Sequence, residues 1–338
     1  MILGGVPATG PRLTNGDSVR VLTGLVAVLL ASGPAVLAQD AADGGHWEET
    51  ARLDAPRAGL AVVVHDGRIF AAGGSGLTSP RDEFESYDPG YERWFPETPL
   101  PRGLEHFGMA ATGERIYAAG GYAADETAVV GPSARMWSFT VEGNIWQSEA
   151  AMPAPKADFS LVAIEGQLYA IGGLRDDASV FVFDPETSEW STLEAPEGIT
   201  RRGTAAVVID GRVHVLGGAT AEGAVDRHDV FDPQSGEWTT GPALPGGRSG
   251  LAAVVRDGRI HVFGGRAADG GATLQDHVSW APGETGWREE AAMPSPRTGA
   301  DAALLDGDIF LVGGGSGGGF FAPFTAIGTT DVFRGPQE

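Results

Sequence analysis

The stretch AVVVHDGRIFAAGG, residues 61–74, decides the fold of this chain. It contains an apolar strand, the two-residue turn Asp66-Gly67, and a second strand that ends in Gly73-Gly74. Aspartate and glycine tolerate the positive φ of a type I′ turn, which joins neighbouring antiparallel strands. The stretch therefore predicts a tight β-hairpin that ends on a pair of glycines.

The glycine pair recurs five more times along the chain. Its first glycines are separated by 47, 52, 45, 47 and 49 residues, and the pairs are Gly73-Gly74, Gly120-Gly121, Gly172-Gly173, Gly217-Gly218, Gly264-Gly265 and Gly313-Gly314. Self-similarity at this period is typical of propellers and arrays. A third apolar strand follows each pair, and in most repeats a turn then leads to a tryptophan, as from Asp184 to Trp190. Four strands per repeat make one propeller blade.

The composition agrees with an all-β class. The 338 residues include 52 glycines, 22 prolines and 8 tryptophans, which suits short strands joined by tight turns better than long helices. A large aromatic at one fixed place per repeat is what stacked, twisted sheets need for packing. We therefore expect the tryptophans to pack between sheets.

The order of Pro-Arg, apolar strand, Gly-Gly, tyrosine-bearing strand and tryptophan resembles the kelch-repeat family from about Trp47 to Phe333. The resemblance implies a six-bladed β-propeller of four-stranded antiparallel blades. The last repeat ends after its third strand, Asp331-Val332-Phe333, and a spare strand at Trp47–Ala51 precedes the first hairpin. We expect this N-terminal strand to pair into the last blade and to close the ring without an open edge.

The N-terminus predicts export. Arg12 and Arg20 precede the apolar run Val21–Ala31, and small residues precede a cleavage site before Gln39. The run of eleven residues is shorter than the roughly 20 needed to cross a bilayer, so no membrane span is expected. Residues 1–38 are thus interpreted as a signal peptide and 39–338 as one propeller, as in an exported bacterial kelch protein that is periplasmic or secreted.

The charge and the residue types of the chain limit the classes of partner and of chemistry that we expect. The net charge of −22 argues against nucleic acid as a partner. The chain has no cysteine, which excludes disulfides, thiolate nucleophiles and the cysteine-crosslinked tyrosine of kelch copper-radical oxidases. Glu222 and Asp226 resemble part of the iron motif of plant kelch specifier proteins, but Val230 stands at the third ligand. We expect no metal, no cofactor and a monomer, with an exported protein or an anionic glycan as the partner.

A basic residue stands sixteen positions before the first glycine of most pairs. The six candidates for ligand binding are Arg57, Arg102, Lys156, Arg201, Arg248 and Arg297, of which Arg102 is displaced by two residues. By the resemblance, the innermost strand of each blade lines the axial channel, so these cations are expected near its mouth. Like charges so arranged repel and require anions. Those anions could belong to a ligand, or acids in the loops after Gly-Gly could pair with the cations inside the protein.

Two exceptions to the repeat point more sharply at a site. His106 and Asp158 occupy positions where the other repeats have Gly59, Gly203, Gly250 and Gly299. Both place an unexpected polar side chain near the axis, where it could move a proton or could simply contact a channel water.

Two functions follow from these features. The first is an exported binding module that uses the loops of one propeller face to hold a protein or a glycan. The alternative is a periplasmic sugar-acid mutarotase or epimerase, similar to the kelch sialic-acid mutarotases. In it, Arg102, Arg201, Arg202, Arg248 and Arg297 would hold a carboxylate, and His106 or Asp158 would act as the acid or base.

Overall fold

The computed structural model describes residues 45–124, 129–173, 179–268, 271–317 and 324–335, and these described residues form one compact unit. The predicted signal peptide at residues 1–38 lies outside the described residues. Within the described ranges, no helix is long and apolar enough to cross a membrane.

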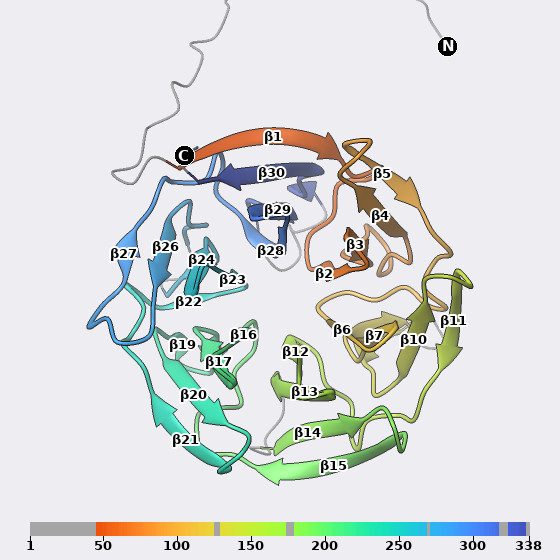
Figure 1. Cartoon of the computed structure of the whole chain (residues 1–338), viewed down its shortest axis with the longest axis horizontal. Helices are drawn as coiled ribbons and strands as arrows, with labels where there is room; N and C mark the ends of the chain where they lie inside the picture. Colours follow the sequence, from red (N-terminus) through yellow and green to blue (C-terminus); the bar gives the residue numbers. More distant parts are fainter. Residues whose placement is uncertain (1–44, 125–128, 174–178, 269–270, 318–323, 336–338) are drawn as a thin grey trace, which may run out of the picture. The chain divides into compact units, whose positions relative to one another are not determined.

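Six four-stranded antiparallel sheets make up this unit, and Figure 1 shows them placed around an axis as the blades of a β-propeller. Blade one is β2 (Ala61–His65), β3 (Arg68–Ala72), β4 (Phe84–Asp88) and β5 (Arg93–Pro96). Blade two is β6 (Gly108–Thr112), β7 (Arg115–Ala119), β10 (Met136–Thr140) and β11 (Ile145–Ser148). Blade three is β12 (Phe159–Ile164), β13 (Gln167–Gly172), β14 (Ser179–Asp184) and β15 (Glu189–Glu194).

The second half of the ring repeats this order. Blade four is β16 (Ala205–Ile209), β17 (Arg212–Leu216), β20 (His228–Asp232) and β21 (Glu237–Thr240). Blade five is β23 (Ala252–Arg256), β24 (Arg259–Phe263), β26 (His277–Trp280) and β27 (Arg288–Glu289). Blade six is β28 (Thr298–Leu305), β29 (Asp308–Gly315), β30 (Thr329–Arg334) and β1 (His46–Arg52).

Short two-stranded sheets decorate one face of the ring. They are β8 (Tyr122–Ala124) with β9 (Val130–Pro132), β18 (Ala219–Thr220) with β19 (Gly223–Ala224), and β22 (Arg248–Ser249) with β25 (Arg266–Ala267). Most of these strands belong to the loops that follow the glycine pairs. They therefore build the rim of the axial opening on that face.

The hairpin turns adopt the predicted conformation. Asp66 and Gly67 have φ values of 47° and 68°, and the Asp-Gly turns of blades four, five and six have positive φ at both residues as well. Ala61 pairs with Ala72 and His65 with Arg68, so the register of the first hairpin is the one set by a two-residue turn. The deciding stretch of sequence thus folds as expected.

The ring closes through the N-terminal strand, as predicted. β1 pairs antiparallel with β30, with Trp47 opposite Phe333. The closing sheet therefore has the order β1-β30-β29-β28, and strands from both ends of the described chain share one blade (Figure 1). Because β1 supplies the outermost strand, blade six has four strands, as the other blades do.

The hydrophobic core lies between neighbouring blades. One cluster joins Phe70 and Phe84 of blade one to Ile116 and Phe139 of blade two, and five similar clusters follow around the ring. Trp94 is buried between blades one and six, where its indole nitrogen donates to Thr330 Oγ1 at 3.1 Å. Packing is thus its role.

Candidate functional site

A pocket of about 700 Å³ lies on the propeller axis, on the face that carries the loops after the glycine pairs. This axial pocket is lined by two recurring positions of the repeat. The first is the residue before a position that is glycine in four of the six repeats, and in five repeats it contributes Ala58, Glu105, Arg202, Ser249 and Thr298. The second is the residue after a glycine pair, which in four repeats contributes Ser75, Tyr122, Ala219 and Arg266. Its volume falls within the range of small-ligand sites, roughly 300–1,000 Å³.

A closed ring of backbone hydrogen bonds forms the floor of the axial pocket. We call it the belt, and its members are Gly59, His106, Asp158, Gly203, Gly250 and Gly299. Each amide donates to the carbonyl of the preceding member, and Gly59 donates to Gly299, over distances of 2.7 to 2.9 Å. Every innermost strand is thereby tied to the next at the axis, so the floor is held rigidly.

The belt requires a left-handed backbone at every position. The four glycines have φ between 63° and 66°, whereas His106 and Asp158 have φ of 51° and 55°. Residues with a side chain are strained there by about 1–3 kcal/mol, and such strain clusters at functional sites. The two exceptions that the sequence singled out are therefore the two strained members of the belt.

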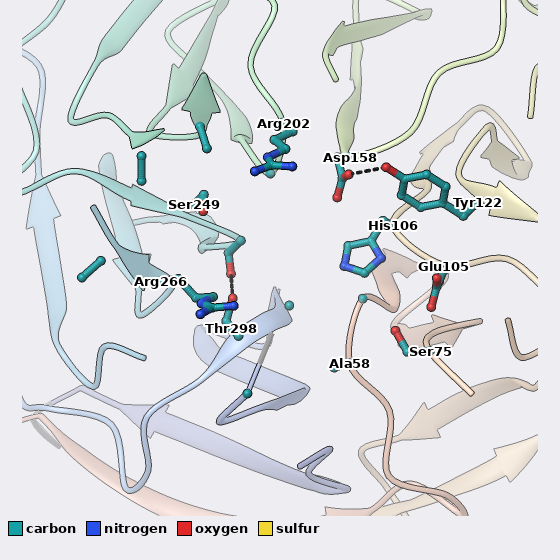
Figure 2. Close-up of a pocket in the computed structure, with 18 of the residues that line it drawn as sticks. Ala58, Ser75, Glu105, His106, Tyr122, Asp158, Arg202, Ser249, Arg266 and Thr298 are labelled. Carbon is teal, nitrogen blue, oxygen red and sulfur yellow. Dashed lines mark hydrogen bonds between the residues drawn. The ribbon is translucent and has the colours of Figure 1, made fainter. Parts of the chain in front are cut away.

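Asp158 is joined to a tyrosine of the neighbouring blade. Tyr122 Oη donates to Asp158 Oδ2 at 2.9 Å, as Figure 2 shows. Burial, followed by the adjacent Asp158 carboxylate, raises the pKa of the Tyr122 hydroxyl. Tyr122 therefore stays protonated and remains a hydrogen-bond donor at the wall of the axial pocket.

His106 stands next to this pair. Its ring meets the Tyr122 ring edge to face, with centroids 6.1 Å apart. Its Nδ1 atom is buried and has no hydrogen-bond partner among the described residues. A Cβ built on Gly59 would lie 2.6 Å from His106 Cε1, so the imidazole fills the space that glycine leaves open in blade one.

Two arginines face the acid–base groups across the pocket. Figure 2 shows Arg202, Arg266, His106 and Asp158 arranged around one space, with Glu105 beside His106. Arg202 is exposed and makes no ion pair with any residue in the described part of the chain. The charge of Arg202 lowers the pKa of Tyr122 slightly against the effects of burial and Asp158, so it acts within this site. The axial pocket can therefore offer a guanidinium to an anion.

The repeated cations lie elsewhere. Arg57, Lys156, Arg201, Arg248 and Arg297 are buried between the strands and are absent from the pocket lining. The sixteen-residue spacing has a direct cause, because a side-chain nitrogen of each reaches the carbonyl of the first glycine in its own repeat, with Arg57 as the exception. The distances are 2.8 Å for Lys156, 2.6 Å for Arg201, 3.4 Å for Arg248 and 3.0 Å for Arg297. We call these five residues and their partners the inter-blade layer.

Acidic partners neutralise most of this layer. Arg201 pairs with Asp229 at 2.7 Å and Arg248 with Asp276 at 2.8 Å. The other two ion pairs are Arg57 with Glu85 and Arg297 with Asp331. Lys156 lies 4.9 Å from the centre of the Phe181 ring. These acids come from the third strand or the residue before it, not from the loops, and the geometry favours internal pairing over ligand binding.

Arg102, the displaced sixth cation, is half-buried and donates to the carbonyl of Ala124. It does not line the axial pocket, and Leu104 occupies the basic slot of blade two, fully buried. The predicted ring of six cations around the channel mouth is thus replaced by five buried cations and one loop anchor. Of the arginines considered as a carboxylate clamp, only Arg202 lines the axial pocket.

The site contains groups that the sequence did not single out. Tyr122, Glu105 and Arg266 were missed because each stands beside a repeated residue rather than at one. A signal was available, since the residue after each glycine pair and the residue before each belt position vary in type from blade to blade. Variable positions next to invariant ones mark a surface that the fold leaves free.

Below the belt lies a second cavity of about 220 Å³. Asp301 lines it, where the equivalent positions hold Ala61, Ser160 or Ala205. Its Oδ2 accepts from Val62 N and its Oδ1 from Ala302 N, both at 2.8 Å. Burial raises the pKa of this carboxyl to about 6. Asp301 therefore joins blade six to blade one within the channel.

No group of three potential metal ligands occurs in the described ranges. The histidines that share repeated slots, His214 with His261 and His228 with His277, are buried in the sheets.

Comparison with known proteins gives consistent matches. The family described as KLHDC2/KLHL20/DRC7 Kelch-repeats domain matches residues 158–327, and the Kelch motif matches residues 56–101. Kelch-like protein 35 of Mus musculus is 30% identical over 201 residues, which cover 59% of this chain and 33% of that protein. Kelch repeat and BTB domain-containing protein 12 of Danio rerio is 30% identical over 163 residues, 42% of this chain and 26% of that protein. The chain thus spans about a third or less of the length of these relatives.

A solved structure, titled "Structure of YjhT", has the same fold. It aligns with a TM-score of 0.71 and 15% sequence identity, and it covers 83% of this chain and 96% of its own. At this identity the likeness concerns the fold alone.

Proposed function

We propose, from the premise that this chain belongs to the kelch-repeat family, that it is a binding module whose axial pocket holds an anionic group of its partner. Kelch propellers bind proteins, and the axial pocket is where loops of five blades converge with Asp158 of blade three. The observation that carries the proposal is Arg202, an exposed guanidinium without an ion pair among the described residues, in a chain of net charge −22. An unpaired arginine offers a carboxylate two parallel hydrogen bonds.

The rim of the pocket adds apolar surface. Leu77 and Phe324 both line it and are 71% and 63% exposed. Exposed apolar side chains beside a charged pocket suit a ligand that combines a carboxylate with an aliphatic or sugar-ring face. The partner we propose is an exported protein or an anionic glycan, both of which present such chemistry.

Export belongs to this proposal as well. Residues 1–38 are proposed to direct the chain to the periplasm or the exterior, where such partners occur. Fractionation of cells that express the full chain with a C-terminal tag tests this. Recovery of the tag only in the cytoplasm, at the mass of the uncleaved chain, contradicts it.

Matched ligands test the binding proposal. Thermal unfolding is measured with glucuronate against glucose, and with an acidic peptide against its amidated form. We expect the acidic member of one pair to raise the melting temperature and its neutral partner to leave it unchanged. The pair that responds identifies whether glycan or peptide is bound.

Two variants locate the effect. Arg202→Ala is expected to abolish the shift, because it removes the anion contact without touching a buried group. Arg212→Ala is the control, since Arg212 lies in the same blade, is exposed, pairs with Asp232 and does not line the pocket. Equal binding by Arg202→Ala and the unchanged chain contradicts the proposal.

A second function is favoured by the strained pair in the belt. Tyr122, Asp158 and His106 could exchange protons with a sugar acid held at Arg202, as a mutarotase or epimerase requires. NMR exchange spectroscopy of the two anomers of glucuronate tests this. Faster interconversion that Asp158→Asn slows by about a hundredfold supports the enzyme, and an unchanged spontaneous rate leaves binding alone.

A further inference from the structure

Four of the seven histidines form two buried pairs that no proposed function uses. His214 Nδ1 lies 2.8 Å from His228 Nε2, and His261 Nδ1 lies 2.8 Å from His277 Nε2. The pairs occupy the same slots of blades four and five, on the second and third strands of each sheet. The two pairs are therefore two copies of the same structural feature.

The geometry of each pair allows only one shared proton. At 2.8 Å the two nitrogens are joined by an N–H···N bond, in which one imidazole donates and the other accepts. A proton added to the accepting nitrogen leaves two donors face to face, so the bond is lost. The nitrogen that carries the added proton is then buried without an acceptor, which is unfavourable.

Burial holds these histidines neutral. It lowers the pKa of His214 and of His261 to about 4, and it lowers the pKa values of His228 and His277 as well. Each pair is therefore neutral at pH 7 and becomes charged only in acid.

The pairs lie on the two sides of blade five. His228 contacts Trp280 and Trp287 of blade five, with ring centroids 5.1 and 5.8 Å apart. His277 faces blade six, where its ring lies 4.8 Å from Phe333 and 5.8 Å from Trp47. Both contacts of blade five with its neighbours thus depend on a neutral imidazole.

The second contact involves ring closure. Trp47 belongs to the closure strand β1, and its indole nitrogen donates to the carbonyl of Ala291 at 2.9 Å. The same carbonyl interacts with His277. A charged His277 would therefore disturb the residue that anchors β1 to blade five.

The charged groups around the pairs do not compensate a new positive charge. Arg212 faces His214, and Arg256 and Arg259 face His261, so these cations oppose protonation. Arg256 also acts on His277. The acids in reach are occupied or exposed: Asp229 near His228 is paired with Arg201 and Arg227, and Asp257 near His261 is largely in solvent. The other facing groups are aromatic rings and the carbonyls of Pro242 and Ala291.

The other blades have no titratable pair in these slots. Blade one holds the stacked rings of Phe70 and Phe84, and blades two and three hold Tyr117 with Met136 and Tyr169 with Val180. The histidine pairs therefore act on the two sides of blade five and have no counterpart in blades one to three.

We propose that the two histidine pairs are an acid latch: protonation of both pairs releases blade five from its neighbours and frees the closure strand β1, opening the propeller at a defined seam. The latch works independently of the axial pocket.

Introduced thiols test where the ring opens, because the chain has no cysteine of its own. Ala291→Cys places a buried thiol at the seam of blades five and six, and Ala118→Cys places one between blades one and two. The thiols are labelled with dithiodipyridine, which reacts in acid. At about pH 4 we expect Ala291→Cys to label on the order of tenfold faster than Ala118→Cys, and at neutral pH both are protected. Equal labelling rates in acid overturn the proposal.

Replacing one histidine pair by the equivalent residues of blade one tests whether the pair causes the opening. His261→Phe with His277→Phe copies the Phe70–Phe84 pair and is expected to remove the acid-induced labelling of Ala291→Cys. Retained labelling overturns the role of the pair. If this variant does not fold, an NMR titration of the unchanged chain tests the same point. We expect all four histidines to be neutral at pH 5, and a pKa of about 6.5 for His277 contradicts the latch.

Discussion

Arg201 and Arg202 are neighbours in the sequence, yet they belong to two different regions of the molecule, the buried inter-blade layer and the solvent-accessible axial pocket. Arg201 lies in the inter-blade layer with no exposed surface, held by Asp229 and the carbonyl of Gly217. Arg202 lines the axial pocket, is exposed and makes no ion pair with the described residues. The repeat contains the first arginine in most blades and the second in one.

The difference shows what symmetry means in this fold. A charge repeated around the ring is buried, so it must be matched by an acid or carbonyl inside its own blade, and its role is structural. An arginine that occurs once, at a position filled in other blades by Ala58, Glu105, Ser249 or Thr298, makes no ion pair with the described residues. Such a charge is available to a ligand.

The largest expected effect tests the buried side of this comparison. Arg201→Ala leaves Asp229 in the core with only the peripheral Arg227 at 2.6 Å, and should lower the free energy of unfolding by about 3 kcal/mol. Urea denaturation at neutral pH measures it. Arg201→Met with Asp229→Leu removes both charges and should recover most of the loss. A stability change below about 0.5 kcal/mol for Arg201→Ala would show that burial does not make this cation structural.

Asp301 extends the comparison between paired and unpaired charges. It lines the cavity below the belt and accepts hydrogen bonds, but it makes no ion pair with the described residues. Its folded pKa of about 6 lies above the ordinary 3.8, so the folded state binds the proton more tightly. The contribution to stability is therefore present below pH 3.8 and is lost as the pH rises to about 6. The loss amounts to about 3 kcal/mol.

Asp301→Asn measures this term. The stability of the unchanged chain relative to the variant should fall between pH 4 and 7, as followed by urea denaturation at each pH. The variant loses one acceptor, which shifts its stability by a constant amount, and it keeps only the pH dependence of the other groups. Parallel curves for the two proteins contradict an uncompensated carboxylate at this place.

The fold could be predicted from the sequence because most of its determinants are local. Asp66-Gly67 needs only its own φ values to form a turn. The closure by Trp47 is not local, but it could be predicted because the last repeat has three strands of its own and the strand at Trp47 has no hairpin partner nearby. The roles of the repeated cations could not be predicted, because whether Arg248 points at the axis or at Gly264 depends on the three-dimensional path of its strand. His106 and Asp158 were found as exceptions to the repeat. Tyr122 was not, because its partner Asp158 comes from another blade.

A smaller effect is expected at the belt, where fold and function compete. His106→Gly removes a strained left-handed residue and should raise the free energy of unfolding by about 0.5–1 kcal/mol. Gly250→Ala, at the equivalent position, should lower it, since the new Cβ would lie 2.6 Å from Thr298 Oγ1. Chemical denaturation of both variants measures the difference. A loss of stability in His106→Gly would show that the imidazole is retained for packing and not for the site.

The smallest expected effect falls on Arg202. Arg202→Ala removes an exposed side chain without an internal partner, so the free energy of unfolding should change by less than about 0.5 kcal/mol. Thermal and urea unfolding of Arg202→Ala beside Arg201→Ala make the comparison within one pair of adjacent residues. A loss near that of Arg201→Ala would place Arg202 in the structural class and remove the anion contact on which binding depends. If Arg202→Ala keeps its stability and loses ligand binding, two residues joined by one peptide bond have different roles: Arg201 stabilises the fold and Arg202 binds the ligand.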